Sequence, residues 1–391
     1  MKGAIKRKLS DVCTIIAGQS PESKYYNQDG IGLPFFQGKA DFGDLYPTIR
    51  TYCSTPTKIA QKNDILLSVR APVGATNLAP TKVCIGRGLT AIRPADCLST
   101  KYLLLFFRYF QAELAQKGAG TTFNAITQTV VKNIEIPVPS ISSQERLVSK
   151  IEELFSEIDN GISALETAKR KLAVYRQVVI TSAFPELSAN NSVTLQEIAA
   201  ISSGITKGRK LEGADILSLP YLRVANVQNG YLNLREIKEI QLKQSELARF
   251  LLEIDDVLYT EGGDRDKLGR GTVWRGEIPR CAHQNHIFKA RLFKEKAVPQ
   301  YVAYWSMTTP ARNYFYEKGK QSVNLASINK TVLSKLPLPL PSLEKQSEIV
   351  STIDQHLSVC NEIENTINKN LQAVAALKQS ILKKAFEGNL L

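Results

Sequence analysis

Asn133-Ile-Glu-Ile-Pro-Val-Pro139 and Lys335-Leu-Pro-Leu-Pro-Leu-Pro341 are two versions of one extended, proline-interrupted segment. Each is followed by a glutamine, Gln144 or Gln346, and then by a long helical pattern that closes in Ala-Phe. The second copy lies 202 residues after the first throughout, as 346 − 144 shows. A constant offset indicates an internal repeat. The chain is therefore predicted to consist of two related globular parts, each followed by a long helix.

The charge of the chain points to a polyanionic partner. Among 391 residues, 50 are Lys or Arg and 37 are Asp or Glu, which gives a net charge of +13. Such an excess suits nucleic acid, although a protein that merely carries surplus lysine would show the same composition. The length exceeds that of one typical domain, so two or three structural units are expected.

Cysteine usage and hydropathy favour a cytoplasmic protein. The 6 cysteines show no C-x-x-C spacing, so neither a disulfide framework nor a zinc ribbon is predicted. Cys281, His283 and His286 lie close together, but alternate residues of a strand face opposite sides and no fourth ligand is evident. No metal site is therefore expected. The chain shows neither an apolar signal segment nor an uninterrupted membrane-length apolar run, so no membrane association is expected.

The two helical patterns carry a sustained heptad of apolar residues, with Ile363 and Leu377 between the seam positions of the second copy. This spacing predicts a narrow seam between two helices, and hence a coiled coil made of the chain's own helices. Packing of each helix on its own domain alone is the alternative. Ser143 and Ser342 are the candidate N-caps, and Gly388 marks the end of the second helix. The seam residues are Ile151, Ile158, Leu165, Leu172 and Val179 in the first copy and Ile353, Cys360, Ile367, Val374 and Ile381 in the second.

The chain order predicts an α+β architecture. Two mixed α/β domains, related by a pseudo-two-fold axis, would be separated by an antiparallel two-helix coiled coil. The predicted boundaries are 1–140 for the first domain, 141–187 for the first helix, 188–340 for the second domain and 341–391 for the second helix. Helices of this length would act as a spacer matched to duplex DNA, whose grooves repeat about every 34 Å.

Within the globular parts, short apolar runs predict strands at 62–68, 255–259 and 286–292. Between shared landmarks the two copies diverge strongly, as expected for two readers of different sequences. The divergent loops carry Arg, Lys, Asn and Gln, which can grip base edges, beside glycines that let the backbone approach phosphate. A solvated surface charge is the alternative for any single residue. The candidates are Lys24, Tyr26, Gln37, Lys39, Arg70, Arg87, Thr122 and Asn124 in the first domain and Lys207, Arg209, Lys210, Arg223, Asn226, Arg265, Lys267, Arg270, Lys320, Gln321 and Asn324 in the second.

Three stretches resemble the specificity subunits of type I restriction-modification systems. They are Leu336-Pro-Leu-Pro-Leu-Pro-Ser-Leu-Glu-Lys-Gln346, Leu377-Lys-Gln-Ser-Ile-Leu-Lys-Lys-Ala-Phe-Glu-Gly388 and Asp256-Val-Leu-Tyr-Thr-Glu-Gly-Gly-Asp-Arg-Asp-Lys-Leu-Gly-Arg270. The resemblance covers nearly the whole chain. The first copy departs from the pattern, since Ser140-Ile-Ser-Ser-Gln144 replaces the usual proline-rich lead.

The resemblance implies two target-recognition domains, each reading one half of a split, asymmetric site in double-stranded DNA. It also implies helices that set the spacing and dock two modification (methyltransferase) subunits, with restriction (nuclease and translocase) subunits left open. The chain itself carries neither an N/D-P-P-Y/F methyltransferase motif nor a G-x-x-x-x-G-K-[ST] loop. We therefore expect no catalytic residues and no cofactor here, with S-adenosylmethionine, ATP and Mg on partner subunits.

Two other functional classes fit the same sequence. An autonomous bipartite DNA-binding regulator would also use paired basic domains. An enzyme with an unfamiliar active site would depend on acidic residues such as Glu261, Asp264 and Asp266. Copurification of partner subunits separates the regulator from the specificity subunit.

Overall fold

The chain divides into two compact units. Unit 1 comprises Met1–Leu165 and Asn368–Leu391, and unit 2 comprises Glu166–Ile367. A computed structural model describes residues 5–118, 125–188, 191–213, 215–321 and 325–390. Each unit contains one globular part and part of each long helix, α4 (Ile141–Ser182) and α10 (Leu343–Phe386). The division between the units therefore falls within both long helices, whereas the predicted domain boundaries lie at the helix ends.

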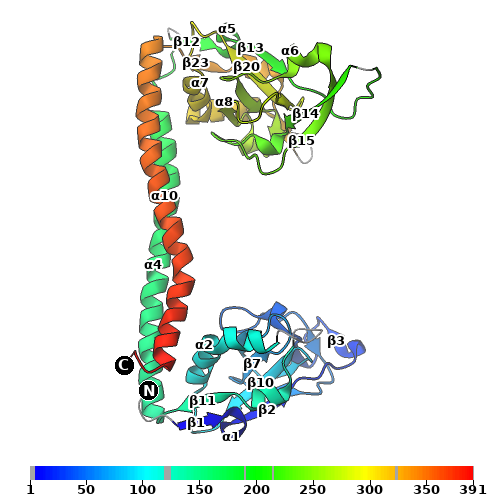
Figure 1. The fold of residues 1–391 in the computed structure, drawn as a ribbon, viewed down its shortest axis with the longest axis vertical. Helices are drawn as coiled ribbons and strands as arrows, with labels where there is room; N and C mark the ends of the chain where they lie inside the picture. Colours follow the sequence, from blue (N-terminus) through cyan, green and yellow to red (C-terminus); the bar gives the residue numbers. More distant parts are fainter. Residues whose placement is uncertain (1–4, 119–124, 189–190, 214, 322–324, 391) are drawn as a thin grey trace. The chain divides into compact units, whose positions relative to one another are not determined.

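The globular part of unit 1 is built on two sheets (Figure 1). The antiparallel sheet has the order β2-β10-β7-β8, and the second sheet, β3-β5-β4-β9-β6, contains the parallel pair β4 and β9. A separate pair joins β1 to β11. The elements are β1 (Ile5–Lys8), α1 (Leu9–Val12), β2 (Cys13–Ala17), η1 (Ser23–Tyr25), β3 (Tyr26–Asn27), β4 (Leu33–Phe36), η2 (Lys39–Asp41), β5 (Tyr52–Cys53), β6 (Ile59–Ala60), β7 (Ile65–Ser68), β8 (Thr76–Leu78), β9 (Val83–Ile85), β10 (Leu89–Pro94), α2 (Thr100–Gly118), α3 (Gln128–Lys132) and β11 (Glu135–Val138).

The globular part of unit 2 repeats the order of the four-stranded antiparallel sheet and has a shorter second sheet. Its antiparallel sheet is β13-β20-β16-β18, its second sheet β15-β14-β19 contains the parallel pair β14 and β19, and β12 pairs with β23. A small sheet, β17-β22-β21, is added. The elements are β12 (Ser192–Thr194), α5 (Leu195–Ile198), β13 (Ala199–Ser203), β14 (Ile216–Leu222), η3 (Val224–Asn226), β15 (Lys238–Lys243), η4 (Gln244–Glu246), α6 (Leu247–Phe250), β16 (Val257–Thr260), β17 (Gly262–Gly263), η5 (Arg265–Lys267), β18 (Gly271–Val273), β19 (Ala282–His283), β20 (Ile287–Leu292), α7 (Pro299–Met307), α8 (Thr309–Lys318), β21 (Lys320–Gln321), β22 (Ala326–Ser327), α9 (Lys330–Ser334) and β23 (Pro337–Pro339).

A buried aspartate links the two inner strands of each antiparallel sheet through an arginine. In unit 1, Asp64 precedes β7 and accepts two hydrogen bonds of 2.8 Å from Arg93 on β10. In unit 2, Asp256 precedes β16 and accepts two of 2.8 Å from Arg291 on β20. Bidentate pairing compensates the desolvation of a buried carboxylate. The shared pair shows that the two globular parts have a common design. The predicted strands 62–68, 255–259 and 286–292 correspond to β7, β16 and β20.

The core of each unit is completed by the end of a helix from the other copy of the repeat. In unit 1, Phe386 at the end of α10 packs among residues of α2, with its ring 5.3 Å from that of Tyr102. In unit 2, Phe184 just after α4 packs against α7, with its ring 5.4 Å from that of Trp305. The phenylalanine of each Ala-Phe ending therefore packs into the hydrophobic core of one unit.

A buried glutamine joins the start of each long helix to the globular part. Gln144 accepts a hydrogen bond from the backbone N–H of Ser99 at 2.8 Å and donates to the carbonyls of Cys97 and Pro139, both at 2.9 Å. Gln346 accepts from the N–H of Val298 at 2.8 Å. It donates to two carbonyls, those of Lys296 and Pro341. The glutamines of the repeat thus saturate backbone groups that would otherwise be buried unpaired.

Replacing Gln346 with alanine should lower the free energy of unfolding by about 2 kcal/mol, because two carbonyls and one N–H lose their buried partner. Urea denaturation of the full chain measures the change. Gln355→Ala is the matched control, because Gln355 is exposed on the same helix. An effect of Gln346→Ala no larger than that of the control would contradict this role.

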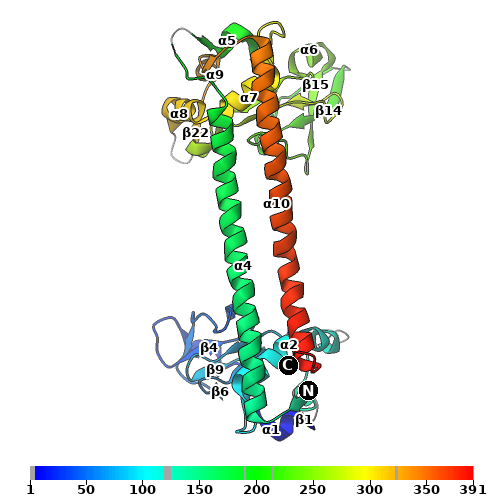
Figure 2. The same cartoon turned by 90° about the vertical axis from the view of Figure 1, so that its left-hand side faces the viewer.

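Within each unit, α4 and α10 lie side by side and run in opposite directions (Figure 2). Lys378 forms an ion pair of 2.6 Å with Asp159 in unit 1, and Arg176 forms one of 2.9 Å with Glu364 in unit 2. The seam residues Ile151, Ile353, Cys360 and Ile367 are buried, while Ile158, Leu165, Leu172, Val179, Val374 and Ile381 are half-buried. The described residues include no helix long and apolar enough to cross a membrane.

Two details of the helices differ from expectation. Ile363 and Leu377 are 45% and 50% exposed, so they lie outside the seam. The first helix begins at Ile141, and Ser140, not Ser143, accepts the capping hydrogen bond, from the N–H of Ser143 at 3.4 Å. Ser342 does cap α10, at 3.3 Å from the N–H of Lys345. The predicted pseudo-two-fold axis concerns the placement of the units and stays a prediction.

Candidate nucleic-acid interface

Three loops of unit 1 meet where strands of its two sheets end. They are residues 37–41 after β4, 69–72 after β7 and 86–88 between β9 and β10; we call them the loop site. The N–H of Gly86 donates to the carbonyl of Phe36 at 2.9 Å, and that of Val69 donates to Gly88 at 3.0 Å. A Cβ atom at Gly88 would lie 2.3 Å from the carbonyl oxygen of Gln37. Glycine at this position therefore allows the first and third loops to touch.

The loop site of unit 1 brings together four of the predicted residues, and a fifth, Tyr26 of β3, lies beside it. Gln37, Lys39, Arg70 and Arg87 are exposed, and neither arginine forms an ion pair with the described residues. Tyr26 stacks on Phe35 with ring centroids 4.6 Å apart beside a hollow of about 810 Å³. Burial raises the pKa of Tyr26, and the positive charge of Arg87 opposes that shift. Unpaired cations and amides at strand ends can bind phosphate and base edges.

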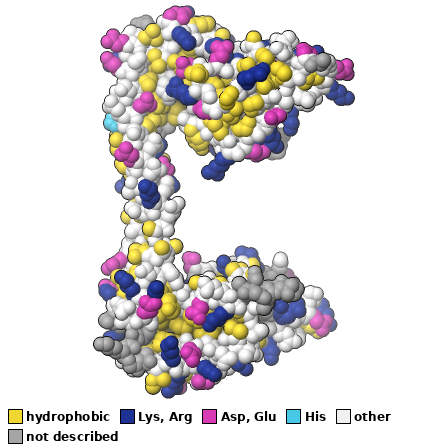
Figure 3. All heavy atoms as spheres, in the orientation of Figure 1, with side chains coloured by type: hydrophobic (Ala, Val, Ile, Leu, Met, Phe, Trp, Pro, Cys, Tyr) yellow, Lys and Arg dark blue, Asp and Glu magenta, His cyan; other side chains and the backbone are white. Residues whose placement is uncertain are grey.

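The other predicted residues of the first domain fall elsewhere. Lys24 is exposed in η1 and pairs with Glu22 at 2.6 Å, a surface contact that a ligand can replace. Thr122 and Asn124 lie outside the described residues. Figure 3 shows further Lys and Arg side chains, interspersed with acidic ones, on the visible face of both globular parts.

Unit 2 builds a loop site on the same backbone frame, from the segments that follow β14 and β16 and from residues 284–286 between β19 and β20. The N–H of Gln284 donates to the carbonyl of Leu222, and the N–H of Glu261 donates to that of His286, both at 2.9 Å. These are the counterparts of the bonds from Gly86 and Val69 in unit 1. Gly204 allows its own segment to pass close to the backbone of His283, because a Cβ atom at residue 204 would lie 2.0 Å from the carbonyl oxygen of His283.

Several predicted residues of the second domain are engaged within the unit. Arg209 forms an ion pair with Glu246 at 2.6 Å, and Arg270 donates to Gln228 at 2.9 Å. Asn226 is a correction to the predicted contacts: it is 3% exposed, and its amide is fully hydrogen-bonded within its own loop. Such a side chain shapes the loop and cannot reach a base.

The remaining predicted residues of unit 2 include both paired and exposed side chains. Arg223, at the position corresponding to Gln37, contacts Glu236, and Arg265 stacks on the ring of Tyr316. Lys267 pairs with Asp264. The exposed side chains are Lys207, Lys210, Lys320 and Gln321, whereas Asn324 lies outside the described residues.

The sequence prediction missed a chain of polar contacts at the loop site of unit 2. Nδ1 of His286 lies 2.7 Å from Oε2 of Glu261, and Nε2 of His286 lies 3.4 Å from Nδ2 of Asn285. The sequence suggests Glu261 only as part of an alternative enzyme site and His286 only as a zinc ligand, and it does not single out Asn285. Only the strand pairing, which the residues alone do not show, makes Asn285 the counterpart of Arg87.

Cys281, His283 and His286 differ in their surroundings, and they do not share the single strand that the sequence suggested: Cys281 precedes β19, His283 ends it and His286 lies before β20. Cys281 is buried, and His283 is buried beside the carbonyl of Phe250, while the His286 side chain is 53% exposed. Burial lowers the pKa of His283 to about 4, with the charge of Lys289 acting in the same direction. No group of three or more His, Cys, Asp or Glu that could hold a metal occurs among the described residues.

Comparison with known protein families gives the same repeat. Residues 1–167 and 188–373 match the family model described as type I restriction modification DNA specificity domain. The chain is a member of this DNA specificity family. The match covers both globular parts and most of both long helices, so it confirms the predicted family, fold class and non-catalytic role in DNA specificity.

Two relatives named as type I restriction enzyme specificity subunits align with nearly the whole chain. The StySPI specificity subunit of Salmonella potsdam is 26% identical over 98% of this chain and 88% of that protein. The EcoKI specificity subunit of Escherichia coli K12 is 24% identical over 100% of this chain and 89% of that protein. The crystal structure of the HsdS subunit from Thermoanaerobacter tengcongensis is 47% identical over 40% of this chain and 38% of that chain, with a TM-score of 0.37. The solved match thus spans about two fifths of either chain.

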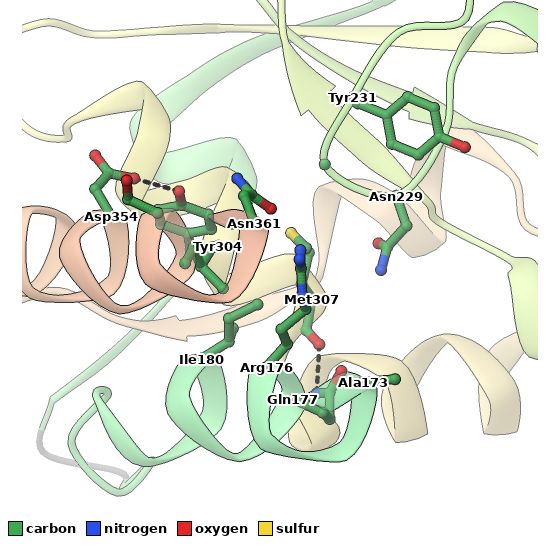
Figure 4. Close-up of a pocket in the computed structure, with 13 residues that line it drawn as sticks. Ala173, Arg176, Gln177, Ile180, Asn229, Tyr231, Tyr304, Met307, Asp354 and Asn361 are labelled. Carbon is green, nitrogen blue, oxygen red and sulfur yellow. Dashed lines mark hydrogen bonds between the residues drawn. The ribbon is translucent and has the colours of Figure 1, made fainter. Parts of the chain in front are cut away.

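This specificity protein also repeats a pocket between helix and globular part, which we call the junction pocket. In unit 2 it has a volume of about 600 Å³ between α4, α7, α10 and the loop of Tyr231 (Figure 4). Tyr304 donates a hydrogen bond to Asp354 there, and Gln177 donates to the carbonyl of Met307 at 2.8 Å. Unit 1 has its counterpart, of about 590 Å³, where Glu152 corresponds to Asp354 by the offset of the repeat.

Proposed function

We propose that this chain directs a type I restriction-modification complex to a bipartite, asymmetric site in double-stranded DNA, with each globular part reading one half. The observation that carries this is the loop site, built twice on the same hydrogen-bonded backbone frame with different side chains. A constant frame places the loops alike, and the variable side chains provide different hydrogen-bond patterns. Unequal readers on one chain specify an asymmetric site.

The repeated junction pockets support two copies of one partner. A duplicated surface of similar volume, formed by equivalent helix segments, presents the same partner with two equivalent sites. Methyltransferase subunits are the partners that the proposed function requires, and they would hold S-adenosylmethionine. ATP and Mg would belong to restriction subunits where these are present. The complex would act in the cytoplasm, where it meets chromosomal DNA. Spacing of the half-sites by the helices remains part of the proposal.

Exchange of one globular part tests the division of labour. Residues 193–340 are replaced by the corresponding segment of another family member, and the chain is assembled with its modification subunits. Sequencing of methylated positions should show one half of the site changed and the other half, with the gap length, unchanged. Changes in both halves, or methylation by the isolated chain, would contradict the proposal.

The exposed cations of the unit 1 loop site should contribute to the salt dependence of DNA binding. Lys39→Ala and Arg70→Ala should each lower the slope of log Kd against log salt by about 1 if the residue contacts phosphate, with equal weakening for all sequences. Fluorescence anisotropy at several salt concentrations measures the slope. Lys345→Ala is the control, since Lys345 pairs with Glu348 at the start of α10 and belongs to none of these loops. Slopes identical to the control would exclude these two contacts.

A further inference from the structure

Arg87 occupies the tip of the short loop between β9 and β10 in unit 1. The residue before it, Gly86, donates its N–H to the carbonyl of Phe36 at 2.9 Å and accepts at its own carbonyl from the N–H of Leu89 at 3.0 Å. These two bonds fix the backbone on either side of Arg87. Its side chain is exposed and pairs with no acidic residue among those described. The guanidinium is thus presented from a rigid base.

Asn285 occupies the equivalent position of unit 2. Gln284 donates its N–H to the carbonyl of Leu222, and its own carbonyl accepts from the N–H of Ile287, both at 2.9 Å. The flanking strands pair in the same order and sense as in unit 1. Asn285 and Arg87 are therefore counterparts in the tertiary structure, although the offset there is 198 (285 − 87) rather than the 202 of the helices.

The side chain of Asn285 is linked to Glu261 through the ring of His286. A carboxylate only accepts hydrogen bonds, so the Nδ1 atom of His286, 2.7 Å from Glu261, carries the hydrogen. Nε2 of the same ring lies 3.4 Å from Nδ2 of Asn285, and it accepts from that amide when it carries no hydrogen. The Oδ1 atom and the second N–H of Asn285 make no hydrogen bond to described residues. Asn285 therefore offers one hydrogen-bond acceptor and one donor to a ligand.

We propose that this loop position reads one base in each half-site, a guanine through Arg87 and an adenine through Asn285. Arginine binds the O6 and N7 acceptors of guanine with two donors, and asparagine matches the N6 donor and N7 acceptor of adenine. Glu261 and His286 are positioning residues that orient the amide. The inference rests on the proposed function and adds the identity of the bases and of the residues that select them.

The test exchanges the two side chains in the full chain assembled with its modification subunits. Methylation is measured on a DNA library randomised in both half-sites. Asn285→Arg should change one position of one half-site from adenine to guanine, with a shift in preference of roughly 10- to 100-fold. Arg87→Asn should make the opposite change in the other half-site. In each variant the unaltered half-site serves as the internal control for folding.

Further variants test the orientation of the amide. Asn285→Asp has the same shape but lacks the N–H donors, so the adenine preference should be lost while the chain remains folded. Glu261→Val introduces the side chain that unit 1 carries as Val69 and should relax the same preference. Glu261→Gln retains an acceptor for Nδ1 and should restore it. A purely structural role of Glu261 would lower thermal stability without changing the preferred base.

Two results would overturn the inference. Equal weakening for all sequences would show that Arg87 and Asn285 contact phosphate, and an unchanged pattern of bases would show that they do not contact DNA. If the wild-type complex showed no sequence preference, the proposed function itself would fail. That outcome is visible before any variant is compared.

Discussion

Replacement of Phe386 with alanine should destabilise unit 1 by roughly 3–5 kcal/mol, the usual cost of removing a buried aromatic ring. The side chain is 9% exposed, and its ring lies 5.3 Å from Tyr102, 5.6 Å from Phe106 and 5.4 Å from Tyr109. The cavity would open beneath α2, which covers the sheet of unit 1. Hydrogen exchange measured by mass spectrometry should therefore accelerate in residues 100–118.

Phe184→Ala is the matched variant for unit 2. The ring of Phe184 lies 4.9 Å from Tyr301 and 5.4 Å from Trp305. Both tryptophans of the chain, Trp274 and Trp305, belong to unit 2, so tryptophan fluorescence reports on this unit. Phe184→Ala should shift the fluorescence transition to lower urea, whereas Phe386→Ala should act first on exchange in α2. Unaltered exchange in α2 of the Phe386 variant would show that the end of α10 does not complete the core.

Gly204→Ala should cost about 3 kcal/mol or more and should disrupt the loop site of unit 2, because the clash involves backbone that cannot rotate away. The added Cβ atom would lie 2.0 Å from the carbonyl oxygen of His283 and 2.6 Å from that of Gln284. Relief requires β19 and the loop of Asn285 to move. Urea denaturation should show the loss of stability, and sequence preference in one half-site should weaken with it.

Gly161→Ala is the control with the opposite sign. Gly161 lies in the middle of α4, and a Cβ atom there would meet nothing within 4 Å. Alanine in a helix interior is favoured over glycine by roughly 0.5–1 kcal/mol, so this variant should be more stable than the wild type. A stability loss in the control comparable to that of Gly204→Ala would mean that the clash at residue 204 is not the cause.

Much of the architecture followed from local patterns. The heptads predicted the long helices because seven-residue periodicity is visible in the chain itself, and the proline-rich segments marked where each helix begins. The repeat predicted that the two globular parts share a fold, which their common strand order bears out. The function of Gln144 and Gln346 was not visible, since their hydrogen-bond partners lie in other segments.

The candidate interface was predicted less completely, for a physical reason. The prediction selected Arg, Lys, Asn and Gln residues in expected loops. This rule found the exposed Gln37, Lys39, Arg70 and Arg87, but it also selected Asn226, whose amide is buried. The type of a residue limits what its side chain can bind. Whether that side chain faces solvent or its own loop depends on packing.

The residues alone determined that this protein is a duplicated domain-and-helix unit with a basic surface, because repeats, periodicity and charge are properties of chain order. The tertiary structure decided which loops meet, and so that Asn285 is the counterpart of Arg87. That pairing depends on backbone hydrogen bonds between strands distant in the chain, which follow from packing against a shared core.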